Sequence, residues 1–182
     1  RMRLDGRSVI HVAGEALSES SAYLAFRDPI RHALELDRSP DGDEARRAYV
    51  RDRLASTPFV RFAPLLAPVL PFAFPDDETT SGLAGEARAD TTRELLSAVL
   101  LGARPVASPV LVVDDAQFLD ASSWSLLARL RAERSDLVTV ICSRPFEEWS
   151  VPREWQRVHD SAATTPIPVG ALASEAVAEL VA

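Results

Sequence analysis

The chain has 182 residues, a net charge of −7 and 47% hydrophobic residues, with 27 acidic and 20 basic side chains. This balance is typical of one soluble globular domain, and the acidic excess disfavours direct nucleic-acid binding by this segment. The single cysteine, Cys142, excludes an intrachain disulfide and a multi-cysteine zinc site, which favours a reducing cytoplasm.

The most hydrophobic window is residues 58–74, and it is not predicted to cross a membrane. It contains Arg61 and several prolines, which are unfavourable in a membrane-spanning helix. We therefore expect no membrane partner. A chain of 182 residues is long enough for one domain with a sizeable core, so we expect a single domain over residues 1–182.

The first part of the chain alternates between strand and helix signals. Residues 1–7 are polar and basic and indicate the tail of a helix, whereas residues 8–13 predict a strand. After a loop over 14–21, apolar residues at helical spacing predict a helix over 22–36. Pro29 within it marks either a kink or the first turn of a second helix.

The middle of the chain is predicted to be helical. Residues 39–42, Ser-Pro-Asp-Gly, break the chain before a charged helix over 43–54. Residues 57–76 hold five prolines among apolar side chains, which indicates short helical turns. A polar loop over 76–86 then precedes a long helix over 87–102.

A strand, a helix and a strand follow within about thirty residues. Two buried strands are predicted over 110–113 and 137–142, with a helix over 121–134 that Asp120 caps. Such a βαβ unit implies parallel pairing with a right-handed crossover. Cys142 lies in the second apolar run, which predicts a small buried thiol.

The C-terminal part is predicted to continue the same alternation. Residues 146–157 indicate a polar, tryptophan-bearing connection, followed by a strand over 165–169 and a helix over 174–181. The fold class that follows is α/β, a parallel sheet with flanking helices.

The strongest chemical signal is Asp114-Asp115, directly after the apolar run Val110–Val113. Two carboxylates cannot lie unpaired in the interior, so we expect them at the carboxyl end of the strand, where open α/β sheets bind ligands. Asp114 is the candidate Mg²⁺ ligand, and Asp115 is the candidate catalytic base or water-orienting group in phosphoryl transfer. The alternative is a strand-to-turn junction in which both aspartates bond only local backbone N–H groups.

Ser143 and Arg144 follow the next strand along the chain. If the two strands pair, these residues reach the same edge as the aspartates, where a cation can contact the γ-phosphate of a nucleotide. The alternative is an exposed loop arginine.

Together these residues resemble the Walker B and sensor 1 elements of AAA+-like P-loop ATPases. The resemblance is closest to the STAND class found in bacterial multidomain adenylate/guanylate cyclases and LuxR-type regulators. The run Asp-Asp-Ala-Gln-Phe-Leu-Asp at 114–120 is close to that group's Asp-Asp-Ala-His-Trp-Ala-Asp. The order of the other segments is also similar: a small-residue loop at 14–16, a Tyr/Phe-rich helix at 23–31, a Pro/Leu-rich stretch at 65–70, a helix at 86–100 and a strand-then-helix ending at 166–181.

The resemblance implies a three-layer P-loop NTPase-like fold that uses ATP and Mg²⁺ in a regulatory switch domain. Asp114 would hold the metal, Asp115 would activate water, and Ser143 and Arg144 would sense the γ-phosphate. A fused cyclase or DNA-binding output domain is the implied partner. The alternative is a non-hydrolysing scaffold or interaction domain of the same fold.

One family element is missing from the chain. All 20 basic residues are arginine, so the phosphate loop Gly-x-x-x-x-Gly-Lys-Ser/Thr cannot occur in it. We expect a domain that lacks the family's first strand and phosphate loop, which would lie upstream of Arg1, and that binds ATP weakly or not at all. The missing strand would leave unpaired sheet edges, so self-association is also expected.

Overall fold

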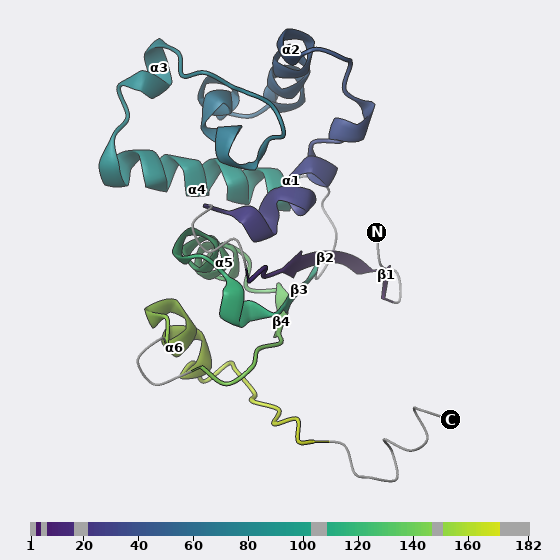
Figure 1. Ribbon diagram of the computed structural model, residues 1–182, viewed down its shortest axis with the longest axis vertical. Coiled ribbons are helices and arrows are strands. Elements are labelled where there is room, and N and C mark those ends of the chain that lie inside the picture. The colour runs from purple at the N-terminus through teal and green to yellow at the C-terminus, as the bar shows by residue number, and fades with distance from the viewer. Residues whose placement is uncertain (1–2, 5–6, 17–21, 103–108, 147–150, 172–182) are drawn as a thin grey trace.

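A small parallel sheet lies at the centre of the computed structural model, which describes residues 3–4, 7–16, 22–102, 109–146 and 151–171. Its three strands are β2 (Arg7–Ala13), β3 (Val110–Asp114) and β4 (Val138–Ile141). A two-residue strand, β1 (Arg3–Leu4), pairs antiparallel with β2, which gives the order β1-β2-β3-β4 (Figure 1). The predicted α/β class, the three central strands and the parallel βαβ unit are confirmed.

Helices make up most of the rest of the described chain. In order they are η1 (Leu24–Phe26), α1 (Arg27–Ala33), η2 (Leu36–Arg38), α2 (Asp43–Leu54), η3 (Val60–Val69), α3 (Glu78–Ser81), α4 (Gly85–Gly102), η4 (Ala116–Phe118), α5 (Ala121–Glu133) and α6 (Arg153–His159). The helix α2 has the predicted bounds. Pro29 lies in the first turn of α1, which confirms the second of the two readings of that proline.

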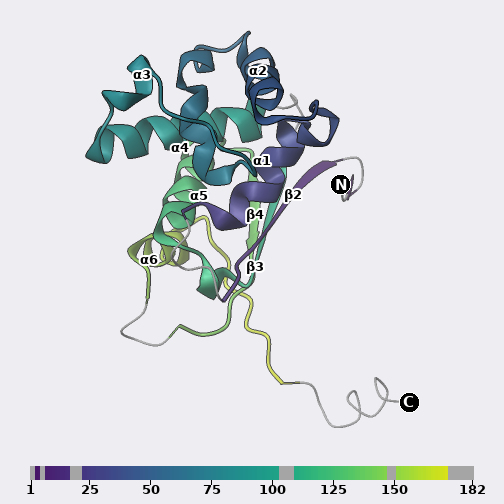
Figure 2. The ribbon, with the colours of Figure 1, turned by 45° about the horizontal axis from the view of Figure 1, so that its top comes forward.

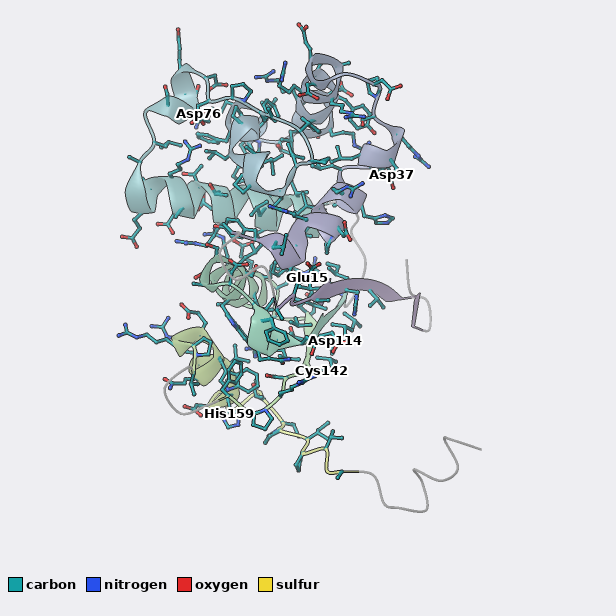
Figure 3. All side chains as sticks on the ribbon, in the orientation of Figure 1. Glu15, Asp37, Asp76, Asp114, Cys142 and His159 are labelled. Carbon is teal, nitrogen blue, oxygen red and sulfur yellow. The ribbon has the colours of Figure 1, made fainter. Side chains whose placement is uncertain are left out.

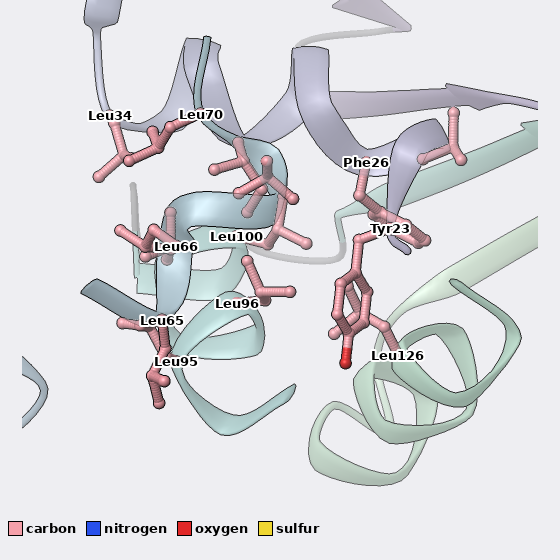
Figure 4. Close-up of a cluster of buried hydrophobic side chains, with 14 of the residues drawn as sticks. Tyr23, Phe26, Leu34, Leu65, Leu66, Leu70, Leu95, Leu96, Leu100 and Leu126 are labelled. Atoms are coloured by element: carbon pink, nitrogen blue, oxygen red, sulfur yellow. The ribbon is translucent and has the colours of Figure 1, made fainter. Parts of the chain in front are cut away.

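The proline-rich stretch forms η3, a ten-residue 3₁₀ helix that contains Pro64 and Pro68. Proline has no N–H to donate, so a regular α-helix is unfavourable here, and the predicted short helical turns are confirmed. Leu65 and Leu66 of this element are buried against Leu95 and Leu96 of α4 in the main core (Figure 4).

The core lies on one face of the sheet. Val12, Leu111 and Val113 point into it and are fully buried. On the opposite face, Val138 and Val140 of β4 are 45% and 46% exposed. Among the described residues, the helical layer of α1, α4 and α5 therefore covers one face only (Figure 2). A three-layer arrangement was expected, in which the strand predicted over 137–142 would be buried.

The single covered face follows from the order of the strands. The chain moves from β2 to β3 to β4 in one direction across the sheet. Because βαβ crossovers are right-handed, successive crossovers in one direction place their helices on the same face. Cys142 follows β4 on the opposite face and is exposed, so the prediction of a buried thiol is wrong.

Three other predictions need correction. The helix tail predicted over residues 1–7 is wrong where the chain is described, because Arg3–Leu4 form a strand that pairs with Arg7 and Ser8 at the start of β2. The loop predicted over 76–86 contains α3, which a capping box at Asp77 stabilises. The connection predicted over 146–157 runs into α6, whose Trp155 packs against Trp124 of α5 with ring centroids 5.9 Å apart.

The strand predicted over 165–169 is also wrong. These residues form no strand, and Ile167 and Val169 are 80% and 91% exposed. Pro166 and Pro168 each remove a backbone donor, and the segment pairs with no described strand. The helix predicted over 174–181 lies outside the described residues.

The side chain of Asp120 links the start of α5 to the backbone just before η1. Its side chain caps α5 as predicted, since Oδ1 accepts the Ser123 N–H at 2.9 Å and Oδ2 accepts the Ser123 hydroxyl at 2.6 Å. Oδ1 also accepts the N–H of Tyr23, 97 residues away, at 3.2 Å. Asp120 is buried, so these bonds compensate for the loss of water around its carboxylate.

We predict that Asp120→Ala lowers the free energy of unfolding by about 2–3 kcal/mol, because it removes a helix cap and leaves the buried Tyr23 N–H unsatisfied. Urea denaturation measures this change. Asp77→Ala is the matched control, since it removes a cap from the four-residue α3 near the surface. We expect it to cost about 1 kcal/mol or less. Equal losses for the two variants would contradict the role of Asp120 as a tertiary link.

Tyr23 provides a pH-dependent prediction. Burial raises the pKa of its phenol above the ordinary value of 10.0, Arg93 opposes the shift and Asp120 adds to it. The folded state therefore favours the neutral phenol, and this contribution to stability is complete below pH 10.0 and is lost as the pH rises through the raised pKa. The variant Tyr49→Phe retains Tyr23 as its single tyrosine. The midpoint of its tyrosinate absorbance should lie at a higher pH in the folded protein than in urea. Equal midpoints in the folded and unfolded states would contradict the prediction.

Candidate functional site

Three strand ends meet at the carboxyl edge of the parallel sheet. Gly14 and Glu15 follow β2, Asp114 ends β3, and the segment from Cys142 to Arg144 follows β4 (Figure 3). The register places Ala13 beside Asp114 and Val113 beside Ile141, so the three ends lie side by side. This is the edge at which open α/β sheets bind ligands.

Backbone hydrogen bonds tie the aspartate turn to both neighbouring strands. The Gly14 N–H donates to the Asp114 carbonyl at 2.9 Å, on the β2 side. On the β4 side, the Ala116 N–H donates to the Cys142 carbonyl at 2.9 Å. The turn between β3 and η4 is therefore held from both sides.

Asp115 adopts a left-handed backbone conformation at this turn, with φ 47° and ψ 44°. Aspartate tolerates this region better than most residues, but the conformation is sparsely populated and has to be maintained by its surroundings. Gly14 is part of that support, because a Cβ added to it would lie 2.3 Å from the Asp115 carbonyl oxygen. Glycine is therefore required for the close approach of β2 to the turn.

The side chains of this edge form a chain of hydrogen bonds. Asp115 Oδ1 accepts from Gln117 Nε2 at 2.9 Å, and Gln117 Oε1 accepts the backbone N–H of Arg144 at 3.0 Å. Gln117 therefore joins the predicted aspartate to the segment that carries the predicted cation. It was not among the predicted site residues, although an amide two residues after Asp115 can donate a hydrogen bond and accept another.

The predicted site residues also bond locally. Asp114 Oδ1 accepts the N–H of Asp115 at 3.1 Å, and the Ser143 hydroxyl donates to the Arg144 carbonyl at 2.7 Å. Asp114, Asp115 and Arg144 are exposed. The structure thus brings the four predicted residues to one open edge, and it also contains the local bonds of the alternative strand-to-turn reading.

A cation at this edge would need ligands from outside the protein. In the part of the chain that the structure describes, no three or more His, Cys, Asp or Glu side chains gather where they could hold a metal ion. Asp114 and Asp115 can supply two carboxylates, and a phosphate and water would have to complete the coordination. Mg²⁺ is commonly bound in this way, through one or two carboxylates together with substrate phosphates.

Another cluster of charged groups lies away from this edge, on α1 and η2. A shallow depression there is lined by Asp28, Arg31, His32 and Asp37. Arg31 pairs with Asp28 at 3.5 Å and with Asp37 at 3.7 Å, so the two acids already have a cationic partner. These groups are explained as surface ion pairs.

Comparison of the chain with models of known protein families, with curated protein sequences and with solved structures finds no match. A search of the described helices for a membrane span also finds none of sufficient length and apolar character.

We predict that Gly14→Ala disturbs the site through the backbone of Asp115. The added Cβ forces the turn or β2 to move, and we expect a loss of about 1–3 kcal/mol in the free energy of unfolding. The amide NMR signals of Asp115, Gln117 and Arg144 should shift together. Gly82→Ala is the control, because nothing lies within 4 Å of a Cβ at Gly82. An unchanged free energy of unfolding in Gly14→Ala would contradict this close contact.

Proposed function

We propose that the carboxyl edge of the sheet binds Mg²⁺ and the terminal phosphates of ATP, and that the chain is part of an ATP-dependent switch domain. The hydrogen-bonded series Asp115–Gln117–Arg144 is the observation that carries the proposal. It couples a carboxylate to the residue bearing a cation, at the edge where parallel sheets bind ligands.

Each residue has a role that its position supports. Asp114 ends an apolar strand with its carboxylate exposed and is the proposed Mg²⁺ ligand. Asp115, oriented by Gln117, is the proposed base or water-orienting group. Ser143 and Arg144 are the proposed contacts of the γ-phosphate, where the exposed guanidinium can form charge-assisted hydrogen bonds.

The affinity of this chain for ATP should be low. The backbone cradle and the lysine of a phosphate loop supply much of the binding in P-loop enzymes, and this sequence contains no lysine. The proposed role of the chain is therefore the metal and γ-phosphate side of the site. A fused cyclase or DNA-binding domain, whose output the switch would control, is proposed as its partner.

We predict that Mn²⁺–ATP, in which Mn²⁺ replaces Mg²⁺ as a paramagnetic probe, selectively broadens the amide NMR signals of residues 114–117 and 143–144. Asp114→Asn should weaken this effect about tenfold or more, because it removes a charged metal ligand. Asp41→Asn is the matched control, since it removes the same charge from an exposed residue that pairs with Arg46 at 3.6 Å.

Selective broadening that survives Asp114→Asn would contradict the assignment of the metal ligand. Broadening confined to other acidic residues would contradict the choice of this edge. Tight binding of ATP by the chain would contradict the inference that a phosphate loop is required.

The second candidate function is a non-hydrolysing scaffold of the same fold. The local hydrogen bonds of Asp114 and Asp115, which complete a turn without any ligand, favour it. Asp115→Asn in a complete protein that contains a phosphate loop separates the two. Turnover reduced about 100-fold or more with nucleotide binding retained supports the switch. Unchanged turnover and signalling support the scaffold.

A further inference from the structure

We propose that a second copy of this chain pairs with the outer edge of β4, antiparallel to it, about a two-fold axis through Val140. The proposal does not depend on nucleotide binding. β4 is the last strand in the sheet order, and no described strand pairs with its outer edge. At the opposite end of the sheet, β1 pairs with Arg7 and Ser8, the first two residues of β2.

The backbone groups on the outer edge can be identified from the hydrogen bonds on the inner one. The N–H groups of Val138 and Cys142 donate to carbonyls of the β3 segment at 3.1 and 2.8 Å. Because successive residues of a strand direct their backbone groups to opposite sides, Thr139 and Ile141 direct theirs outward. Among the described residues no backbone group bonds to them, so two donors and two acceptors can pair with another strand.

The outer edge lacks the charged side chains and prolines that often prevent pairing of an edge strand. Residues 137–143 contain no charged residue and no proline, and are rich in β-branched side chains. Two copies of a chain with a net charge of −7 repel each other, so an uncharged strand is the part best suited to direct contact.

The open face of the sheet extends the same contact. With Val140 opposite its own copy, Val138 lies opposite Cys142 of the second copy, on the face that the described helices leave uncovered. Val138 and Val140 are 45% and 46% exposed, and cross-strand pairing would cover them. Such apolar pairs are the usual source of stability between adjacent strands.

Charge selects this register. With the axis through Val140, Asp136 lies opposite Arg144 of the second copy at both ends of the pairing. Moving the axis to Thr139 would instead place Arg144 opposite Arg134 of the second copy, a like-charge pair. Asp136 already contacts Arg134 at 2.7 and 2.8 Å, and a second guanidinium can share its carboxylate.

Another occupant of the edge would be the segment 165–169 of the same chain. Its Ile167 and Val169 are exposed, and in an extended conformation their N–H groups would lie on one side of the segment. This segment is tethered to β4 in the same chain and yet remains unpaired, so the second copy is the occupant we propose.

A disulfide trap tests the register. Val138→Cys places a cysteine opposite Cys142 of the second copy, so mild oxidation should give a covalent dimer with a mapped 138–142 bridge. The same two cysteines cannot bridge within one copy, because four residue steps along an extended strand place them about 13 Å apart. Val138→Cys combined with Cys142→Ser should lose this bridge, and His11→Cys, on the same face of β2, should not form a bridge to Cys142.

Analytical ultracentrifugation of the unmodified chain and of Thr139→Pro tests the edge. The proline removes an outward N–H without removing a bond to β3, and should weaken the dimer about 10- to 100-fold. Thr139→Val is the control and should keep the dimer, because it retains the N–H and removes a buried hydroxyl that has no hydrogen-bond partner in the described structure.

A dimer in the unmodified chain together with the 138–142 bridge supports the proposal. A chain that stays monomeric at all concentrations would overturn the proposal. Slow amide exchange of Thr139 and Ile141 in a monomer would also overturn it, because it would indicate that the edge is paired within the chain. If Thr139→Pro does not fold, the disulfide map decides.

Discussion

The direction of the crossovers between the three parallel strands constrains the rest of the molecule. From β2 to β3 to β4 the chain steps one way across the sheet, so right-handed connections build a helical layer on one face. That face buries Val12, Leu111 and Val113. The same arrangement directs all three carboxyl ends to one edge and leaves the apolar side chains of β4 on the other face partly exposed. The candidate site and the proposed dimer contact therefore have the same origin.

The candidate site combines backbone strain with a ready-made set of hydrogen bonds. The left-handed conformation of Asp115 persists because Gly14 allows β2 to pack against its carbonyl and because Ala116 is bonded to the β4 side. Strain of this kind is concentrated at functional sites, which agrees with a ligand-binding role. The local bonds of the same carboxylates would equally complete a structural turn, so the response to a bound metal ion is what distinguishes the two readings.

Arg144 links the two proposals. Its backbone N–H is held by Gln117, while its guanidinium is exposed and lies at the end of the outer strand. In the nucleotide site the guanidinium would contact the γ-phosphate, and in the dimer it would lie opposite Asp136 of the second copy. The side chain cannot fully satisfy both partners at once. Nucleotide binding and strand pairing are therefore expected to oppose each other, and a strand supplied from elsewhere to the edge of β4 would favour the nucleotide site.

The sequence alone determined the features that depend on neighbouring residues. The Ser-Pro-Asp-Gly break at 39–42 located the start of α2, Asp120 was recognisable as a cap, and an apolar run before Asp114 placed the aspartates at a strand end. Only the tertiary structure decided which face of the sheet is covered, that Cys142 is exposed, that residues 165–169 form no strand, and that Gln117 joins Asp115 to Arg144. Local patterns record propensity and spacing, whereas burial and strand pairing depend on which distant segment lies alongside, and that contact is formed only when the chain folds.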